Sequence, residues 1–288
     1  MFSEAVVQFY RLCYGKFHLR GAGWLLRRLA PWLSGLQSYP LPVPGVGVAL
    51  LDFRDRSAFG LLNADLGGLR NDLYLLRNLE KLLKPGDVFW DVGANIGYIS
   101  SHFAHPQYKL SSLHAFEPNP TPLRMLQSLF ATHPFVTVHP FGLGDKDKTI
   151  PMSLSSAGSC NGTLARNLNE GKQIQVHIRC GDAVRRELRL PCPNVIKIDV
   201  EGFEPSVFAG LSETIAACRP IIVFEHIWLS DDQIKQFAPA NFLLYFIHDD
   251  GTIATDFSTR LKGHDAIFIP NEKAQWFAAG LQPPLEKG

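Results

Sequence analysis

The stretch Asp87–Ser100, DVFWDVGANIGYIS, decides the fold of this chain. Val88, Phe89 and Trp90 form the short apolar run that a fully buried parallel strand needs. Asp91 ends this run, and a turn of mostly small residues, GANIG, leads into the start of a helix. A strand, a glycine turn and a helix N-terminus present free backbone N–H groups and let a ligand touch the backbone. The stretch therefore predicts a ligand-binding unit within an α/β fold.

The spacing of the glycines indicates which ligand this turn would bind. Gly93 and Gly97 are separated by three residues, so the central glycine of the dinucleotide fingerprint G-x-G-x-x-G is missing. Asp91, two places before the first glycine, suits a ligand with an ammonium group rather than a diphosphate. S-adenosylmethionine is such a ligand, because its methionyl amino group is cationic. The alternative is a plain turn between a buried strand and a helix.

Glu117 is the second indication of this ligand. It follows another mostly apolar strand, Leu113–Phe116, and stands 24 positions after Gly93. A carboxylate accepts two hydrogen bonds, so at this spacing it can bind both ribose hydroxyls. The alternatives are a solvated loop carboxylate, or a cap on the helix that we expect at Thr121–Thr132. The combined spacing favours the ribose.

A third strand, Phe135–Phe141, completes this half of the predicted sheet. The adenine of the ligand should lie at the carboxyl end of that strand. Gly142 and Asp145 follow the strand and are candidates for that contact. A tight turn explains these two residues equally well.

The stretch Asn194–Glu204, NVIKIDVEGFE, is the other chemical centre. Lys197, Asp199, Glu201 and Glu204 crowd the carboxyl end of a short apolar strand. Ligands bind beyond the carboxyl ends of strands in open parallel sheets, so these groups indicate acid–base chemistry or a metal. The alternatives are that Glu204 begins the next helix favourably and that Lys197 pairs with an acid.

Glu225 and His226 end a further apolar strand, Ile221–Phe224. If this strand and the one before Asp199 are neighbours, their ends bring Asp199, Glu201, Glu225 and His226 into one cleft. Oxygen-rich ligands with an imidazole can hold Mg²⁺ or a similar hard cation. The same groups can instead deprotonate a hydroxyl directly, with His226 as the natural base near neutral pH.

The rest of the main domain has weaker patterns. We expect an edge strand at Ala49–Phe53 and a helix from Asp72 that Pro85-Gly86 ends. Asn241–His248 and His264–Ile269 predict a closing antiparallel pair. The Ser-, Gly- and Asn-rich stretch Ser155–Gly171 predicts a long loop, which either folds over the acceptor or is inert.

Length, charge and hydropathy limit the class of protein. The chain has 288 residues, 46% of them hydrophobic, which suits one large α/β domain with an N-terminal extension. A net charge of +1, from 28 basic and 27 acidic residues, argues against nucleic-acid binding. No apolar run reaches the length of a membrane span. The sequence does not indicate an oligomeric state.

The cysteines are odd in number and contain no C-x-x-C pair. This pattern is typical of reduced thiols in a cytoplasmic protein and not of a disulfide framework or a zinc site. The five residues are Cys13, Cys160, Cys180, Cys192 and Cys218.

Residues 1–45 form a predicted N-terminal extension, which is basic, amphipathic and helical, before a main domain at 46–288. Its tryptophans and basic residues fit a helical flap that covers the acceptor site, or a segment in peripheral contact with a membrane surface. The small size of the basic cluster favours the flap. Glu4 is the one acid among residues 1–40, against Arg11, Lys16, Arg20, Arg27 and Arg28.

Three blocks together resemble the FkbM-type methyltransferase family: DVGANIGY, FEPNP and IKIDVEGFE, in that order. The resemblance covers roughly residues 70–270. It implies a class I methyltransferase (Rossmann-like) sheet, mostly parallel with an antiparallel closing strand and helices on both faces. It also implies S-adenosylmethionine as the donor and O-methylation of a sugar, glycan or secondary metabolite as the reaction.

The resemblance also implies roles for single residues. The cofactor would be held by Asp91, Gly93, Asn95, Gly97 and Glu117, with their neighbours Ala94, Tyr98 and Asn119 as further candidates. By the same resemblance, the acidic centre of the family would consist of Lys197, Asp199, Glu201 and Glu204. Together with the residues at the end of the next strand, the candidates for catalysis are Lys197, Asp199, Glu201, Glu225 and His226. Distantly similar macrolide-sugar O-methyltransferases hold Mg²⁺ with carboxylates at two corresponding strand ends, which here gives Glu201, Glu225 and His226. The imidazole departs from that all-acidic pattern.

Two other functions compete with methyl transfer to an acceptor molecule. A protein that binds S-adenosylmethionine without catalysis would not need Asp199, Glu201 and Glu225 together. An NAD-dependent oxidoreductase would need the glycine that is missing between Gly93 and Gly97. In the reaction that we expect, the methyl group passes directly from the sulfonium to an acceptor oxygen, and the protein holds both reactants in line.

Overall fold

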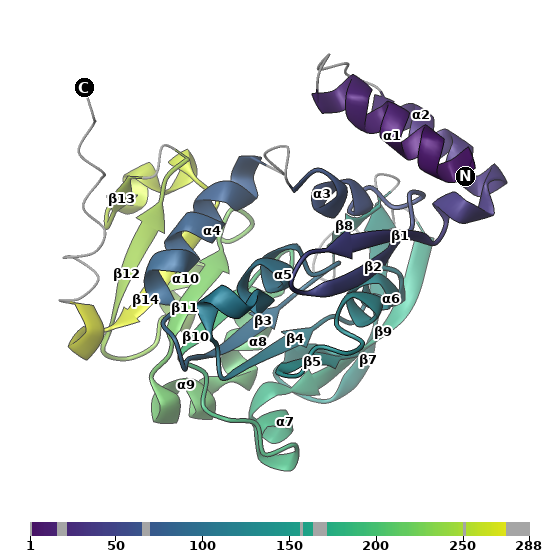
Figure 1. Ribbon diagram of the computed structural model, residues 1–288. Coiled ribbons are helices and arrows are strands. Elements are labelled where there is room, and N and C mark those ends of the chain that lie inside the picture. Colours follow the sequence, from purple (N-terminus) through teal and green to yellow (C-terminus); the bar gives the residue numbers. More distant parts are fainter. Residues whose placement is uncertain are drawn as a thin grey trace.

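A central mixed sheet with helices on both faces forms the body of the molecule (Figure 1). The computed structural model describes residues 2–15, 22–64, 70–155, 158–163, 172–249 and 252–274. A smaller sheet and a two-stranded hairpin adjoin the central sheet.

The central sheet has the strand order β13-β12-β14-β11-β10-β3-β4-β5. The five strands from β11 to β5 are parallel, and β14 runs antiparallel between β11 and β12. This is the predicted class I methyltransferase sheet with its closing antiparallel pair. The strands are β3 (Val88–Val92), β4 (Ser112–Phe116), β5 (Val136–His139), β10 (Val195–Ile198), β11 (Ile221–Glu225), β12 (Phe242–Ile247), β13 (Ile253–Ala254) and β14 (Asp265–Pro270).

The sheet buries both of its faces in separate apolar clusters. Phe89 and Trp90 are consecutive residues of β3, and they belong to different clusters because side chains alternate along a strand. Both side chains are fully buried, as the apolar run of β3 predicts. Helices cover the sheet: α4 (Arg70–Leu82), α5 (Tyr98–Ala104), α6 (Pro120–Leu129), α8 (Glu204–Gly210), α9 (Ser212–Cys218) and α10 (Asp231–Phe237).

The N-terminal part is helical, as predicted, and a hairpin of strands follows it. The expected edge strand lies slightly earlier than Ala49–Phe53, and within the described residues it pairs with β1 and not with the central sheet. The predicted boundary at residue 45 falls in the turn of this hairpin. The elements are α1 (Phe2–Gly15), α2 (Ala22–Leu29), η1 (Ala30–Trp32), η2 (Ser34–Leu36), β1 (Tyr39–Val43), β2 (Gly47–Leu51) and α3 (Ala58–Leu62).

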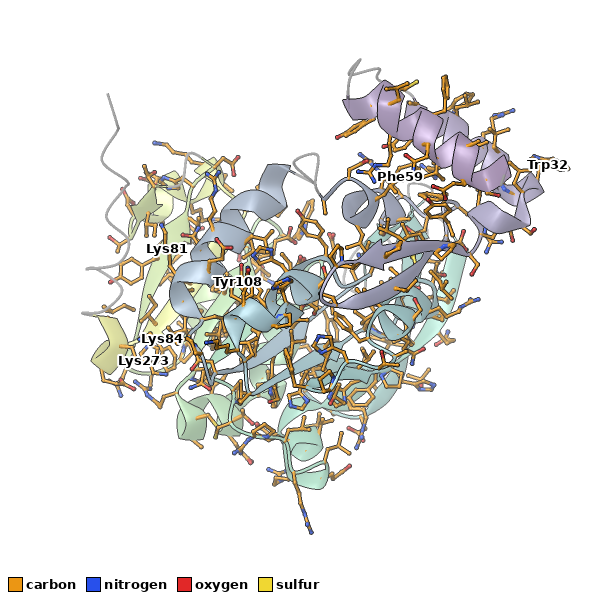
Figure 2. All side chains as sticks on the ribbon, viewed as in Figure 1. Trp32, Phe59, Lys81, Lys84, Tyr108 and Lys273 are labelled. Carbon is orange, nitrogen blue, oxygen red and sulfur yellow. A yellow bond between two sulfur atoms is a disulfide. The ribbon has the colours of Figure 1, made fainter. Side chains whose placement is uncertain are left out.

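Aromatic and polar contacts fasten α1 to the main body. Tyr10 packs edge-on against Phe59, and its hydroxyl accepts a hydrogen bond from Asn63 Nδ2 at 2.8 Å. The Tyr39 hydroxyl donates to Glu4 at 2.8 Å. Figure 2 shows Phe59 beside the two helices, which extend from one corner of the molecule.

The smaller sheet has the order β6-β9-β7-β8 and corrects one prediction. The expected loop Ser155–Gly171 contains a strand, β8, which pairs antiparallel with β7. Its Ser, Gly and Asn residues gave no apolar alternation from which a strand could be predicted. Residues 156–157 and 164–171 of that loop lie outside the described residues. The elements here are β6 (Gly142–Gly144), β7 (Lys148–Ser155), β8 (Gly158–Thr163), β9 (Lys172–Cys180) and α7 (Gly181–Glu187).

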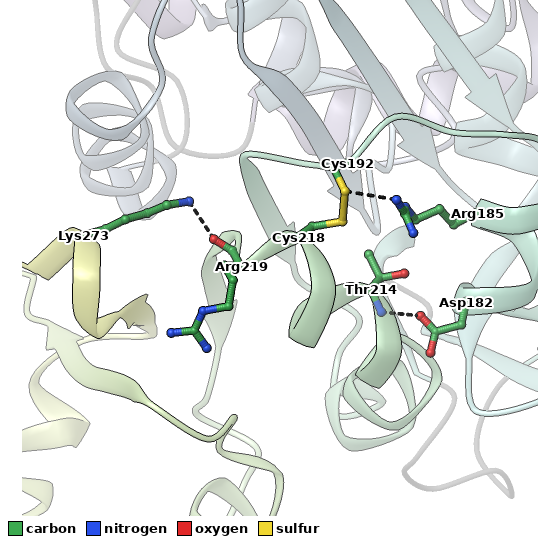
Figure 3. The surroundings of a disulfide bond; sticks show 7 residues. All are labelled: Asp182, Arg185, Cys192, Thr214, Cys218, Arg219 and Lys273. Carbon is green, nitrogen blue, oxygen red and sulfur yellow. Dashed lines mark hydrogen bonds between the residues drawn. A yellow bond between two sulfur atoms is a disulfide. The ribbon is translucent and has the colours of Figure 1, made fainter.

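The prediction of reduced thiols is wrong for two of the cysteines. Cys192 and Cys218 form a disulfide, and Arg185 Nη2 donates a hydrogen bond to Cys192 Sγ at 3.0 Å (Figure 3). The two residues are 26 positions apart, but they precede the adjacent strands β10 and β11 and therefore meet at the amino edge of the sheet. Cys13 and Cys180 are free thiols.

None of the described helices combines the length and the apolar character that crossing a membrane requires.

Candidate active site

The carboxyl ends of four parallel strands meet at one edge of the sheet. In the register, Val92 of β3 lies opposite Phe116 of β4 on one side and Ile198 of β10 on the other. Ile198 in turn lies opposite Phe224 of β11. The chain order reverses between β3 and β10, which is where open α/β sheets bind ligands. All the predicted site residues except Gly142 and Asp145 lie in the last residues of these four strands or in the segments that follow them.

The turn after β3 packs directly against the turn after β10. Gly93 has a φ of +80°, and a Cβ atom there would lie 1.9 Å from the carbonyl oxygen of Asp199. Gly97 has a φ of +88°, and Asn95 between them has a φ of +51°. These left-handed conformations explain why glycine stands at both ends of the turn. The turn therefore holds its backbone in a fixed conformation beside the acidic residues.

Glu117 is buried between the turn after β3 and the start of α6. Its carboxylate accepts hydrogen bonds from the backbone N–H of Asn95 at 2.8 Å and of Asn119 at 2.7 Å. Burial nevertheless raises the pKa of Glu117 to about 7. Each carboxylate oxygen can accept a second hydrogen bond, so the group retains acceptor capacity for a ligand. The predicted alternative of a solvated loop carboxylate does not fit this burial.

Two amide side chains on either side of Glu117 have unsatisfied polar atoms. Asn119 Oδ1 accepts from Thr121 N–H and caps α6, but its Nδ2 has no hydrogen-bond partner among the described residues. Asn95 Oδ1 is likewise buried without a hydrogen-bond partner in the part of the chain that the structure describes. A buried donor and a buried acceptor of this kind are costly unless water or a ligand pairs with them. Their position beside Glu117 therefore indicates a site for a ligand with hydroxyl groups.

Asp91 and Lys197 form a buried ion pair below the turn. Lys197 Nζ lies 3.1 Å from Asp91 Oδ1 and 3.5 Å from Asp199 Oδ2, and it donates to the Gly93 carbonyl at 2.9 Å. Asp91 Oδ2 accepts from the Ser100 hydroxyl at 2.6 Å. Asp91 is fully buried, and through these contacts its carboxylate orders the turn and α5. The predicted alternative for Lys197, pairing with an acid, is confirmed.

Three carboxylates gather at the ends of β10 and β11. Asp199, Glu201 and Glu225 each offer an oxygen, and these oxygens all lie within 4.8 Å of one another. Burial raises the pKa of Glu225, and the nearby charges of Asp199 and Glu201 raise it further. Glu225 Oε2 is buried and makes no hydrogen bond within the described ranges. The cluster therefore favours either a shared proton or a hard cation between its members.

Glu204 shapes the loop that carries this cluster. Its Oε1 accepts from the backbone N–H groups of Val200 at 3.1 Å and Gly202 at 3.2 Å. This loop places Glu201 in a left-handed conformation with a φ of +55°. Burial raises the pKa of Glu204 to about 7. As the alternative prediction states, Glu204 begins a helix, α8, and it lies outside the group of three acids.

His226 is not part of the acidic cluster. Its ring is fully buried and packs edge-on against Phe246, and Arg260 Nη1 lies 3.3 Å from Nδ1. Burial first, and the charge of Arg260 second, lower the pKa of His226 to about 4. A buried neutral imidazole beside a guanidinium is poorly placed to bind a cation or to take a proton from an acceptor. The predicted metal ligands are Glu201, Glu225 and His226, whereas the observed cluster has Asp199 in place of His226.

The predicted adenine contacts lie in different surroundings. A Cβ atom on Gly142 would be 3.3 Å from Pro118, so Gly142 adjoins the Glu117 loop. Asp145 accepts hydrogen bonds from Ser206 at 2.6 Å and from Lys148 at 2.7 Å, which lower its pKa to about 2. Its contacts are thus with α8 and β7. Nearer the glycine turn, Ala94 is buried and Tyr98 is half-buried at the start of α5.

Two residues that organise the site were not predicted from the sequence. Ser100 binds Asp91 from the first turn of α5, and its place three residues after Gly97 was the available signal. Arg260 donates to Asp231, to the carbonyls of Leu229 and His226 and to the His226 ring, so it fastens the loop after β11. It lies 34 residues after His226, and no local pattern links the two.

Comparison with known proteins relates this site to a family. Residues 91–252, more than half of the chain, match the family described as "Methyltransferase FkbM domain". A hexuronic acid methyltransferase, AglP, of Haloferax volcanii is 31% identical over 160 residues, which cover 55% of this chain and 64% of that protein. A 31-O-demethyl-FK506 methyltransferase, FkbM, of Streptomyces tacrolimicus is 29% identical over 171 residues, covering 49% of this chain and 64% of that protein.

The alignments leave part of each relative unmatched. The chain spans just under two thirds of the length of these two proteins. A crystal structure of a methyltransferase FkbM from Methylobacillus flagellatus superposes with a TM-score of 0.44 at 17% identity, covering 85% of this chain and 60% of that one.

Proposed function

Because this chain belongs to the methyltransferase FkbM domain family, we propose that it transfers a methyl group from S-adenosylmethionine to a hydroxyl of a sugar, glycan or secondary metabolite. The observation that carries the proposal is Glu117, a buried carboxylate with acceptor capacity to spare, at the carboxyl end of β4.

The polar atoms around Glu117 support S-adenosylmethionine as the donor. Two adjacent ribose hydroxyls would donate to the Glu117 carboxylate. Asn95 Oδ1 and Asn119 Nδ2, which have no partner among the described residues, would supply one acceptor and one donor beside it. Gly142 lies against Pro118 and Ile178 and thus adjoins the loop that carries Glu117. Asp91 and Lys197 contribute by fixing the turn, and not by contact with the ligand.

The names of the relatives support oxygen as the acceptor atom. One relative is named for hexuronic acid and the other for the 31-O-demethyl form of FK506, so both names point to oxygen-rich acceptors. The acidic cluster supports the same reading, because a hydroxyl must lose its proton when it is methylated. Asp199 keeps 40% of its side chain exposed and is the member best placed to meet an acceptor.

The protein would act mainly by positioning. It would hold the acceptor oxygen in line with the sulfonium methyl group, which removes much of the entropic cost of bringing two reactants together. Asp199 would take the hydroxyl proton as the new C–O bond forms and the bond from sulfur to the methyl carbon breaks. Lys197 would keep Asp199 oriented through their 3.5 Å contact.

The cluster also fits a divalent cation. Carboxylate oxygens are the ligands that Mg²⁺ and Ca²⁺ prefer, and Asp199, Glu201 and Glu225 present three of them. The buried Oε2 of Glu225, without a partner in the described part of the chain, is the atom that most needs a positive neighbour. A bound Mg²⁺ would lower the pKa of the acceptor hydroxyl.

The test is transfer of labelled methyl from S-adenosylmethionine into fractionated lipid, polysaccharide and small-molecule extracts, with Mg²⁺ or with EDTA. We expect label in one fraction for the wild type and for Glu213→Ala, a control at an exposed carboxylate on α9. Glu117→Ala should give none. Cofactor binding without label in any fraction would instead favour a non-catalytic binding protein. Equal labelling by Glu117→Ala would refute the proposed cofactor site.

A further inference from the structure

The two N-terminal helices, with the short 3-10 helix η1 that follows them, expose a group of large apolar side chains to solvent. These side chains are between 48% and 84% exposed, and three of the five are aromatic. Single exposed apolar residues are ordinary, but several on one pair of helices indicate an interaction surface. We call this group the apolar arm; it consists of Phe9, Leu12, Trp24, Leu25 and Trp32.

The apolar arm faces away from the domain. Val7 of α1 and Leu26 of α2 are buried in the same core cluster as one face of the central sheet. Because both helices turn their buried sides toward that cluster, their exposed sides point outward together. Figure 2 shows Trp32 at the outer end of the helices, away from the central sheet. The helices thus pack on the domain, as the flap prediction requires, yet leave these apolar side chains uncovered.

The charge around the apolar arm is positive. Arg11, Arg27 and Arg28 lie on the two helices, and Glu4 is the acid of the described N-terminal helices. The Arg28 guanidinium lies 5.3 Å from the centre of the Trp24 ring, so an exposed cation and an exposed aromatic ring share one place. Aromatic rings beside arginines suit the boundary between lipid tails and headgroups, where one end is apolar and the other is wet.

We propose that the apolar arm and its arginines bind the surface of membranes that contain anionic lipids. Phe9, Leu12 and the two tryptophans would enter the boundary between headgroups and acyl chains, and Arg28 would bind lipid phosphates. The helices have 14 and 8 residues, so they would lie along the surface. A second copy of this chain fits less well, because two arms of the same positive charge would repel each other.

Sedimentation with vesicles tests this proposal and does not depend on the proposed enzymatic function. The probes are vesicles of phosphatidylcholine alone and of phosphatidylcholine mixed with phosphatidylglycerol. We expect the wild type to sediment with the anionic vesicles and to dissociate as salt increases. The double variant Trp24→Ser/Trp32→Ser should bind weaker by on the order of tenfold or more. Arg28→Glu should weaken binding to anionic vesicles selectively.

The matched control is Leu261→Ser, which removes an apolar side chain that is 73% exposed on η5 (Phe257–Lys262). It should bind like the wild type, and thermal melting should show that all variants fold. Quenching of the wild-type tryptophan fluorescence by brominated lipid should follow binding and fall in Trp32→Phe. Wild type that stays in solution with anionic vesicles would overturn the proposal. So would unchanged binding by the double variant, or a dimer in light scattering that the same substitutions abolish.

Discussion

The two ends of the adjacent strands β10 and β11 are built in opposite ways. At the amino edge, the disulfide between Cys192 and Cys218 joins the segments that lead into the strands. At the carboxyl edge, Asp199, Glu201 and Glu225 place three acidic oxygens within 4.8 Å of one another. One end is covalently closed, whereas the other gathers three carboxyl groups.

The carboxyl edge therefore lowers the stability of the fold, whereas the amino edge raises it. Like charges and a buried carboxylate with a raised pKa destabilise the carboxyl edge unless a ligand, proton or cation compensates them. The disulfide restrains the same two strands from the other side. Variants that act at one edge only should therefore separate activity from stability.

Glu225→Gln removes a carboxyl group from the carboxyl edge and keeps the shape of the side chain. We expect turnover to fall by on the order of 100-fold or more, because the cluster loses an acid or a cation ligand. The melting temperature should hold or rise, since the lost carboxylate was buried among like charges. Methyl-transfer rates and thermal melts measure the two effects. A lower melting temperature with normal turnover would make Glu225 a structural residue.

The same substitution, glycine to alanine, can be made at both edges of the sheet. Gly93 follows β3 at the carboxyl edge, and Gly86 precedes it at the amino edge. Both glycines have positive φ, +80° and +89°, so each variant should lose about 1–2 kcal/mol from backbone strain. Only Gly93 also has the Asp199 carbonyl 1.9 Å from its added Cβ, whereas nothing lies within 4 Å at Gly86. Gly93→Ala should therefore be less stable and lose cofactor binding, as denaturant melts and titrations would show. Equal stability of the two variants would contradict the close packing of the two turns.

Cys192→Ser/Cys218→Ser opens the amino edge. The disulfide closes a loop of 26 residues, so its loss should cost about 3 kcal/mol of unfolding free energy. Turnover of the folded protein should stay within about twofold of the wild type, because the strands still pair through their backbone. Denaturant melts with and without reductant, and rates well below the melting temperature, measure both. A large loss of turnover in the folded variant would show that the amino edge controls the site.

The pH dependence of cofactor binding tests whether Glu117 becomes ionised when the cofactor binds. Burial raises its pKa from 4.5 to about 7, and hydroxyl donors from a ribose would favour the ionised form. Binding must then release a proton below pH 7, so the dissociation constant should rise by up to about tenfold per pH unit as the pH falls. Titrations from pH 5.5 to 8.5 measure this. Glu117→Gln should bind weakly with a flat profile; a flat profile in the wild type would mean that Glu117 is already ionised throughout.

Most of the fold was predictable because its strands are short apolar runs with a polar residue at the carboxyl end. DVFWD, HAFE, IKID and VFE each gave a strand and placed a candidate residue beyond it. The parallel register then brought Asp91, Glu117, Asp199 and Glu225 to one edge. Local sequence thus predicted which residues would meet at the site.

The rest depended on contacts that sequence order does not reveal. Cys192 and Cys218 are brought together by the pairing of β10 with β11. His226 was expected in the cleft, but Arg260 binds its ring from another part of the chain. The exposure of a side chain after a strand depends on such partners. Asp91 likewise has partners on two other elements, since Lys197 of β10 and Ser100 of α5 bind its two oxygens.

The most direct test of the central claim is a calorimetric titration of S-adenosylmethionine at pH 8 into the wild type, Glu117→Gln and Glu213→Gln. We predict that the wild type and Glu213→Gln bind equally well. Glu117→Gln should bind weaker by on the order of 100-fold, because a charge-assisted contact to both ribose hydroxyls is lost. Equal affinity in all three proteins would contradict the assignment of the cofactor site to the carboxyl ends of β3 and β4.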